Sequence, residues 1–184
     1  MRVRRKKSFL LRFLKKIVDT GLFLLIVLTL TYITVNYVAQ RTIVHNVSMQ
    51  KTLYEGDNLI TDKLTYRFRE PERFEIICFR SEGERHDLIK RIIGLPGETI
   101  QILNGEIVIN GEVIADQGGL KPASYAGRAE NEITLGSNEY FVMGDNRDES
   151  IDSRYEEVGN IKRSSIVGRA IFRIYPFPKF GLID

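Results

Sequence analysis

Ser48 is the first residue that could do chemistry, because a lysine follows it three positions later in the stretch VSMQKTL. The spacing S-x-x-K is used by serine acylases of the penicillin-binding and class A β-lactamase type, where one helical turn brings the two side chains together. A serine hydroxyl is a weak nucleophile when free and needs a base that is unprotonated at working pH. An isolated S-x-x-K is common on protein surfaces, so the rest of the chain must identify the base.

A lysine can serve as that base only where burial or a neighbouring positive charge lowers its pKa, which is ordinarily about 10.4. Lys51 lies among polar residues and turn formers in MQKTLYEGD, and Glu55 and Asp57 favour its charged form. Lys90 lies in the strand pattern DLIKRIIG, between two aliphatic neighbours on one face and directly before Arg91. The sequence therefore favours Lys90 as the base. The alternative is a lysine whose head group reaches solvent from a strand edge.

A third stretch, GDNRDESIDSR at residues 144–154, follows the apolar pattern EYFVM and concentrates charge. Such a loop is usually a solvated turn. Its interleaved acids and arginines would also let internal ion pairs hold a hydroxyl such as Ser150 near a site. The charged positions in this loop are Asp145, Arg147, Asp148, Glu149, Asp152 and Arg154.

The N-terminal part predicts a membrane anchor. Residues 20–40 carry no charge, and 21 helical residues are long enough to cross a hydrocarbon core of about 30 Å. Residues 1–19 hold eight Lys and Arg against a single acid, so the positive-inside rule predicts that they are cytoplasmic and that residues 41–184 are extracytoplasmic. A cleavable signal peptide is the alternative. The long apolar run, and the lack of a small residue three positions before Ala39, favour an uncleaved anchor at the cell membrane.

Residues 41–184 predict a mainly β domain, because short runs of Val, Ile, Phe and Tyr are divided by Gly, Asn, Asp and Pro. The Asn104-Gly105 and Asn110-Gly111 pairs flank EIVI and predict tight hairpin turns, which makes residues 98–114 a meander. Residues 115–132 lose the alternation and predict an exposed loop. The predicted strands are RTIVHNV, DNLITDKL, FEIICFR, DLIKRIIG, ETIQIL, EIVIN, EVIA, EYFVMG and SIVGRAIFRIY.

Charge, cysteine and histidine content argue against several other classes. From residue 20 onward the chain has 19 basic and 23 acidic residues, so no nucleic-acid groove is predicted despite the overall charge of +3. Cys78 is the one cysteine and lies in the apolar run FEIICF, which predicts a buried thiol and a core without an internal disulfide. His45 and His86 are far apart without a cysteine cluster, so no metal site is predicted.

Three stretches of the chain resemble the sequence motifs of the type I signal peptidases, both in their order and in their residues. They are SMQKTL followed by EGD, KRIIGLPGE and GDNRDESIDSR. These are membrane-bound Ser/Lys endopeptidases that remove signal peptides from exported proteins. With the anchor and the closing RIYPFPKFGLI, the likeness covers nearly the whole chain, and the short length with one span resembles the enzymes of Gram-positive bacteria. The resemblance implies a signal-peptidase-type domain of antiparallel sheets and hairpins after one transmembrane helix, with no cofactor.

The resemblance also implies roles for individual residues. Ser48 falls on the nucleophile, Lys90 on the general base and Ser150 on the serine that orients this lysine. The backbone N–H of Ser48 falls on one oxyanion donor, and the side-chain amide of Asn46 on the position of the second. The charged positions that brace the site are Arg91, Asp145, Arg147, Asp152 and Arg154.

The resemblance further implies a substrate that lies extended against strand edges, as an added strand. It would offer small residues in the Ala-x-Ala pattern, so the expected partners are preproteins with such a cleavage site, together with membrane lipid. The two edges are formed by Ile43, Val44 and His45 and by Asp87, Leu88 and Ile89. One position departs from the family's usual S-M-x-P-T-L: Lys51 stands where proline would fix φ near −65°.

Three alternatives compete with a signal peptidase. A penicillin-binding acylase would also show K-T-G and S-x-N elements, and the chain has neither. A self-cleaving repressor would carry a DNA-binding head where this chain has a basic anchor. The third is a signal-peptidase-like accessory or chaperone protein of pilus assembly with little or no proteolysis. The presence of both Ser48 and Lys90 favours an active peptidase over this alternative.

Overall fold

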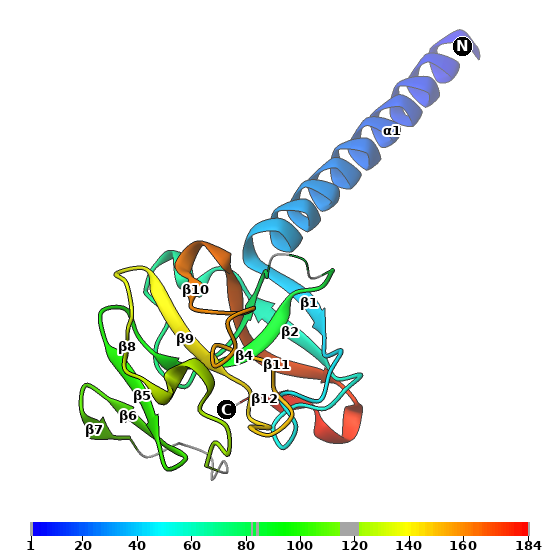
Figure 1. Cartoon of the computed structure of the whole chain (residues 1–184). Helices are drawn as coiled ribbons and strands as arrows, with labels where there is room; N and C mark the ends of the chain where they lie inside the picture. Colours follow the sequence, from blue (N-terminus) through cyan, green and yellow to red (C-terminus); the bar gives the residue numbers. More distant parts are fainter. Residues whose placement is uncertain (1, 82, 84, 115–121, 184) are drawn as a thin grey trace. The chain divides into compact units, whose positions relative to one another are not determined.

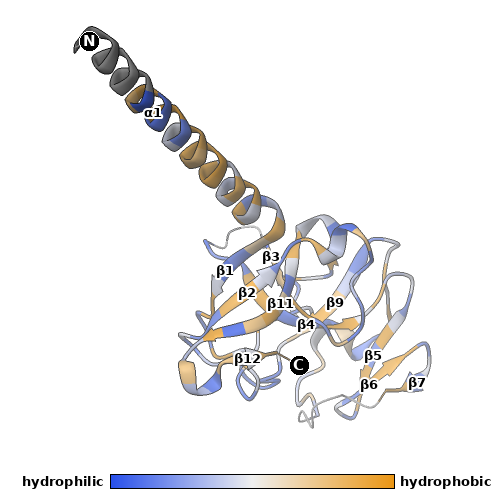
Figure 2. Cartoon of the chain, turned by 180° about the vertical axis from the view of Figure 1, so that it is seen from behind, coloured by the Kyte–Doolittle hydropathy of each residue, from blue (hydrophilic) through white to orange (hydrophobic). Residues whose placement is uncertain are grey.

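The computed structural model describes residues 2–81, 83, 85–114 and 122–183, in a helical unit ending at Val38 and a β unit beginning at Ala39. The helical unit consists of α1 (Arg2–Ile33) followed by a π-helical turn, η1 (Thr34–Val38). Within the described residues, Arg12–Val38 forms one helix of 27 residues that is apolar enough to cross a membrane, and an 18-residue stretch of it has a mean hydropathy of 2.0. Figure 2 shows this apolar stretch along α1.

Several polar side chains of this apolar helix make hydrogen bonds within the helix itself. The hydroxyls of Thr29, Thr31 and Thr34 each donate to the carbonyl four residues earlier, at 2.8–2.9 Å. Such internal bonds are what a hydrocarbon environment requires, because no water is available there to pair with a polar group. The predicted span extends to Gln40, whereas Ala39 and Gln40 lie in the first strand of the β unit.

The β unit contains an eight-stranded sheet in which every neighbouring pair is antiparallel (Figure 1). The last long strand inserts between two strands from the first half of the domain, which ties the two ends of the domain together. In spatial order the strands are β1 (Ala39–Ile43), β2 (Asn58–Asp62), β11 (Ile166–Tyr175), β3 (Ile76–Phe79), β4 (Leu88–Gly94), β9 (Glu139–Met143) and β10 (Ile161–Lys162), with β12 (Gly181–Leu182) paired to β11.

A smaller antiparallel sheet has the order β7 (Glu112–Val113), β6 (Glu106–Ile109), β5 (Thr99–Leu103) and β8 (Ile133–Thr134). The two predicted hairpin turns are confirmed, because Asn104 and Asn110 have φ angles of 52° and 51° and the glycine after each also has a positive φ. The short 3₁₀ helices of the domain are η2 (Thr65–Arg67), η3 (Gly127–Glu130), η4 (Arg163–Ser165) and η5 (Phe177–Lys179).

Strand β4 contributes side chains to all three hydrophobic clusters of the domain. Its isoleucines Ile89, Ile92 and Ile93 belong to three different hydrophobic clusters of the core. Because each cluster packs against a different part of the sheets, the backbone of β4 is held from several sides at once. Cys78 on the neighbouring β3 is a fully buried free thiol, as predicted, and burial raises its pKa to about 11.

The mainly β class is confirmed. Eight of the nine predicted runs contain one observed strand, and the first, RTIVHNV, overlaps β1, which begins earlier, at Ala39. The prediction misses β8, β10 and β12, which have two residues each and are too short to show an alternating pattern. In the predicted loop 115–132, residues 115–121 lie outside the described residues, and the part from Gly127 to Glu130 is the helix η3 rather than loop.

Candidate active site

Ser48 lies in a tight turn, residues 46–53, that follows β1. A backbone hydrogen bond of 2.8 Å from Leu53 N–H to the Met49 carbonyl closes the turn, and both side chains are completely buried in the core. The carbonyl of Ser48 also accepts a hydrogen bond of 3.0 Å from the N–H of Asn146, in the loop after β9. These contacts hold Ser48 from both sides, and only 4% of it is exposed.

The side chain of Asn46 faces Ser48 with its oxygen. The Ser48 hydroxyl donates to Asn46 Oδ1 at 2.7 Å, and the Ser48 backbone N–H donates to the same oxygen at 3.3 Å. This orientation differs from the expected donor role, because an amide oxygen accepts hydrogen bonds and only the Nδ2 group can donate them. In the structure, Asn46 Oδ1 therefore accepts hydrogen bonds from both the hydroxyl and the backbone N–H of Ser48.

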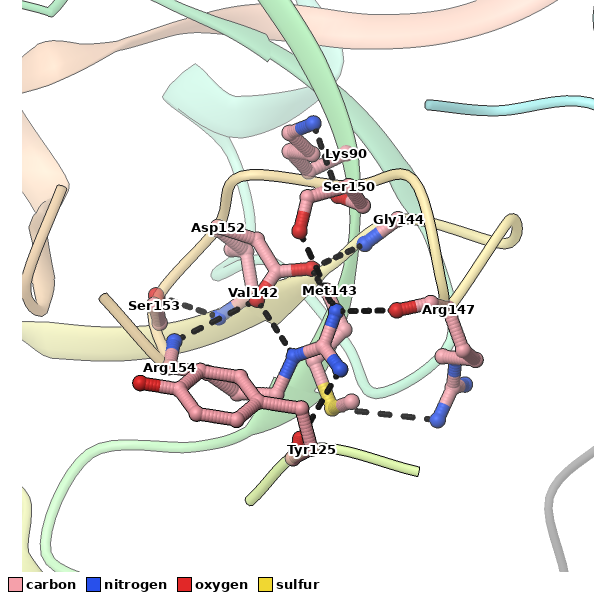
Figure 3. Close-up of polar contacts among 10 residues, drawn as sticks. All are labelled: Lys90, Tyr125, Val142, Met143, Gly144, Arg147, Ser150, Asp152, Ser153 and Arg154. Atoms are coloured by element: carbon pink, nitrogen blue, oxygen red, sulfur yellow. Dashed lines mark hydrogen bonds and ion pairs between the residues drawn. The ribbon is translucent and has the colours of Figure 1, made fainter. Parts of the chain in front are cut away.

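Lys90 lies on β4 and is 2% exposed. Its Nζ donates a 3.0 Å hydrogen bond to Ser150 Oγ, a contact visible in Figure 3. Burial is the largest influence on Lys90 and lowers its pKa to about 8, because a desolvated ammonium is disfavoured. The Asp152 and Asp145 carboxylates oppose this shift, whereas the positive charge of Arg154 reinforces it. At pH 7 about one tenth of Lys90 is therefore unprotonated and can accept a proton, and about half is unprotonated at pH 8.

One pocket contains both Ser48 and Lys90, although the two residues come from different elements 42 positions apart. Its volume is about 360 Å³. Sequence reasoning missed most of the remaining lining, because pocket walls bring together residues without a shared motif. The lining residues are Asn46, Val47, Ser48, Ser81, Leu88, Lys90, Glu149, Ile151, Glu157 and Val158.

A buried ion pair fixes the loop after β9 to the strand that carries Lys90. Arg91, the next residue of β4, binds both carboxylate oxygens of Asp145, at 2.8 and 2.7 Å, and also donates to the Phe74 carbonyl at 2.8 Å. The hydroxyl of Thr52 donates to the same carboxylate and thereby connects it to the turn of Ser48. Asp145 thus joins the three segments that build the site, and Thr52 is a supporting residue that sequence reasoning missed.

A second buried ion pair shapes the loop internally (Figure 3). Arg154 binds both oxygens of Asp152, at 2.8 and 2.9 Å, and Asp152 accepts the Gly144 N–H at 3.0 Å. Arg154 also donates to the carbonyls of Arg147 and Ser150, at 2.7 and 3.2 Å. This pair therefore fixes the backbone position from which Ser150 reaches Lys90. Of the predicted bracing residues, Arg147 acts here through its carbonyl, and its guanidinium lies 3.7 Å from Met143 Sδ.

Gly144 permits the close approach of these parts. A Cβ atom at this position would lie 2.3 Å from Ser150 Oγ and 2.4 Å from the Ser48 carbonyl oxygen, distances that no side chain can occupy. Sequence reasoning did not assign a role to this residue. The available signal was a glycine directly after an apolar strand and directly before the charged loop.

The two predicted substrate edges lie near each other. The ring of His45, just after β1, stacks on the ring of His86, just before β4, with centroids 4.4 Å apart. Strand β1 is at the edge of its sheet. Val44, one of the predicted substrate contacts, is not free to bind a peptide. Its N–H donates to the Asp57 carbonyl and its own carbonyl accepts the Gly56 N–H, both at 2.9 Å, and its side chain is buried. Consecutive residues of a strand direct their backbone polar groups to opposite edges, which leaves those of Ile43, the last residue of β1, facing the free edge.

The second edge is the beginning of β4. Leu88 and Ile89 pair with β3 on one side, whereas β9 pairs with β4 only from Arg91 onward. Within the described residues, no strand therefore covers the other side of Leu88 and Ile89. Asp87 lies directly before them and accepts a 2.9 Å hydrogen bond from Gln40 of β1, which links the two edges.

Lys51, the other lysine of the S-x-x-K motif, has a different environment. It is exposed and has a φ of 92°, in the left-handed region that is unfavourable for residues other than glycine. Proline cannot adopt this angle, because its ring holds φ near −65°. The departure from S-M-x-P-T-L is therefore a change of backbone conformation as well as of side chain.

Comparison with known proteins identifies the family. The model of "Signal peptidase, peptidase S26" matches residues 17–175. The chain belongs to the signal peptidase family. A probable signal peptidase I-2 of Synechocystis sp. is 35% identical over 153 residues, covering 80% of this chain and 68% of that protein. Signal peptidase I V of Bacillus subtilis is 37% identical over 136 residues, covering 68% of this chain and 79% of its own length.

A solved structure of a signal peptidase I from Enterococcus faecalis is 31% identical, with a TM-score of 0.46 over 55% of this chain and 97% of that one. The predicted resemblance to type I signal peptidases is confirmed by the family model and by these relatives. Because they come from cyanobacteria as well as from Bacillus, they support the Gram-positive likeness only loosely. The part matched by the signal peptidase family includes Ser48, Lys90 and the loop 144–154.

Proposed function

We propose that this chain is a membrane-anchored signal peptidase I, a serine endopeptidase that removes N-terminal signal peptides from exported preproteins. The observation that carries the proposal is Lys90, a lysine that is 2% exposed, has a pKa of about 8 and shares one pocket with Ser48. A serine and an unprotonated amine in a common pocket are the parts that a Ser/Lys acyl transfer needs. The many signal peptidases among its relatives support the choice of substrate.

In the proposed mechanism, neutral Lys90 removes the proton from the Ser48 hydroxyl while Oγ forms a bond to the scissile carbonyl carbon. The resulting tetrahedral intermediate collapses, the C–N bond breaks, and the Lys90 ammonium gives its proton to the leaving amine. Lys90 is neutral again and removes a proton from a water molecule while the water oxygen forms a bond to the acyl carbon. The bond between this carbon and Ser48 Oγ then breaks, the Lys90 ammonium returns the proton to Oγ, and the signal peptide leaves with a new carboxyl end. Ser150 is the positioning residue, because its hydroxyl accepts the hydrogen bond that aims the Lys90 amine.

The oxyanion is proposed to bind the Ser48 backbone N–H. In the structure this N–H makes only a long bond of 3.3 Å to Asn46 Oδ1, which a negatively charged oxygen would displace. The second donor is proposed to be the Asn46 side-chain amide after a rotation that brings Nδ2 forward, since the terminal torsion of asparagine is broad. One oxyanion donor typically contributes about 3 kcal/mol to the lowering of the barrier.

The substrate is proposed to lie extended between the Ile43–His45 edge and the Leu88–Ile89 edge and to present small residues in an Ala-x-Ala pattern. Lipid would surround α1, with the basic N-terminus in the cytoplasm and the β unit outside, as the positive-inside rule predicts. The anchor would place enzyme and preprotein in the same membrane. The accessory role in pilus assembly is not favoured, because both dyad positions are filled and buried.

The test is cleavage of a purified preprotein with an Ala-x-Ala site by the full chain in detergent micelles. We expect cleavage after the second alanine by the wild type, identified by sequencing the new N-terminus. The Ser48→Ala variant should show none. If the wild type leaves the preprotein intact under conditions in which an established signal peptidase cuts it, the proposed function is wrong.

A further inference from the structure

The pocket that holds Ser48 and Lys90 is also lined by two carboxylates, Glu149 and Glu157. Both lie in the connection between β9 and β10, in which no helix or strand intervenes. Apolar side chains also line the pocket: Leu88, Ile151 and Val158. Among the described residues that line the pocket, Lys90 is the only Lys, Arg or His, and its amine is already bound to Ser150. The described part of the wall therefore has two acidic groups without a compensating cation.

Both carboxylates are available to a ligand. Glu149 and Glu157 are exposed, and within the described part of the chain neither side chain has a hydrogen bond or an ion pair. Their neighbour Glu156 differs, because it lies 3.8 Å from the Arg128 guanidinium and outside the pocket lining. Two free carboxylates in one concave wall attract a cation and repel an anion that enters the same pocket.

The location of the pocket identifies the ligand as part of the substrate. Ser48 and Lys90 are 4% and 2% exposed and border this same pocket. Leu88 and Lys90 share the face of β4 that borders it, whereas the side chain of Ile89 lies in a core cluster on the other face. A peptide whose carbonyl reaches Ser48 therefore enters the pocket that the two glutamates also line.

We infer that Glu149 and Glu157 select substrates with a lysine or arginine close to the scissile bond and discriminate against an acidic residue there. This inference rests on the proposed function and adds a charge preference to the small residues of the Ala-x-Ala pattern. The preference concerns positions near the scissile bond other than the two alanines, which are the middle residue of the pattern and the first residues after the cut. The set of preproteins that the enzyme cleaves would then be narrower than the set that merely has small residues in the Ala-x-Ala pattern.

The experiment uses internally quenched peptides with one Ala-x-Ala site and the full chain in detergent micelles at low salt. Lys, Gln or Glu is placed in turn at the middle residue and at each of the first two positions after the cut. At one or more of these positions we expect kcat/KM for the Lys peptide to exceed that for the Glu peptide by about tenfold, as two partly exposed charge pairs provide. This ratio should decrease in high salt, because exposed charges are screened.

Variants assign the preference to the two residues. In Glu149→Gln/Glu157→Gln the ratio should fall to about one, and in Glu157→Lys it should shift in favour of the Glu peptide. Glu156→Gln is the matched control, since it removes an adjacent carboxylate outside the pocket, and it should retain the wild-type ratio. A wild-type ratio near one at all three positions, or a ratio that persists in the double variant, overturns the inference.

Failure of the proposed function has a different signature. If the wild type does not cut even the Gln peptides, the proteolytic function is wrong whatever the charge preference. In that case fluorescence anisotropy with the Ser48→Ala chain and labelled Lys and Glu peptides measures the preference without turnover. Tighter binding of the Lys peptide that is lost in the double glutamine variant supports the role of the two glutamates, and equal binding overturns it.

Discussion

The turn of residues 46–53 and strand β4 each contribute a lysine to the neighbourhood of Ser48, and the two lysines are opposite in character. Lys51 is three residues from Ser48 in the chain, exposed and on a backbone with φ of 92°. Lys90 is 42 residues away, buried, and shares a pocket with Ser48. Lys90 has the desolvation that lowers an amine pKa toward neutrality. In the proposed mechanism, burial rather than distance along the chain therefore distinguishes the base.

The two regions also differ in how they are supported. Each charged residue around β4 has a partner: Arg91 binds Asp145, and Arg154 binds Asp152, both with two hydrogen bonds. Within each pair the two opposite charges offset one another. Burial therefore lowers the pKa of Lys90 more than any single neighbouring charge changes it. The exposed Lys51 has no comparable environment.

The largest expected effect separates the two lysines directly. Lys90→Ala should lower kcat/KM for preprotein cleavage by about 10⁴-fold or more, because it removes the base on which the nucleophile depends. Lys51→Ala should stay within about threefold of the wild type, since an exposed side chain outside the pocket is removed. Loss of activity in Lys51→Ala together with retention in Lys90→Ala would reverse the assignment.

Gly144→Ala should give the next largest effect. The added methyl would lie within 2.4 Å of both Ser150 Oγ and the Ser48 carbonyl oxygen, so one of the two must move. We expect kcat/KM to fall about 10²-fold, the scale of a misplacement of about 1 Å in an active site. Gly136→Ala is the matched control, because its methyl would meet only the flexible end of Glu139, at 3.3 Å, and its activity should remain near that of the wild type.

The buried pairs can be tested through stability. Asp145→Asn leaves the Arg91 guanidinium, in a residue that is 6% exposed, without its counter-charge. The free energy of unfolding of the β unit should drop by about 3–5 kcal/mol, as for other buried pairs that lose one partner. Glu156→Gln, which removes the exposed partner of Arg128, should cost less than about 1 kcal/mol. Chemical denaturation in micelles measures both, and equal small losses would mean that the Arg91–Asp145 pair does not hold the site.

The smallest effect concerns the backbone of the turn. Lys51→Gly should stabilise the protein by up to about 1 kcal/mol, because glycine adopts a φ of 92° without steric cost. Lys51→Pro should destabilise it, since the proline ring cannot reach that angle. Thermal denaturation in micelles ranks the two variants. A proline variant as stable as the glycine variant would show that the turn has a different conformation in solution.

Local patterns in the sequence predicted the strands and turns of the fold well. The Asn-Gly pairs at residues 104–105 and 110–111 supply the positive φ angles that their hairpins need. The alternation around Lys90 predicted a buried strand, and β4 is that strand. What the sequence could not provide was the order of the strands, because the insertion of β11 between β2 and β3 joins segments about 100 residues apart.

The same limit applies to the site. The resemblance placed Arg91 and Asp145 beside the base, but their mutual pairing across 54 residues is a property of the fold. Gly144 matters because of what lies near it in space, and a single sequence does not show that. Asn46 was expected to present its N–H group, and the structure instead turns its oxygen to Ser48, since side-chain orientation depends on the local partners.

The pH dependence of kcat/KM for preprotein cleavage tests the central claim most directly. Only unprotonated Lys90 can accept the Ser48 proton, so activity should increase about tenfold per pH unit below the pKa and level off above it, with a midpoint near the Lys90 pKa of about 8. Lys51→Ala should leave the midpoint unchanged. A profile that stays flat down to about pH 5, where even a buried lysine with this pKa is protonated, would contradict Lys90 as the base.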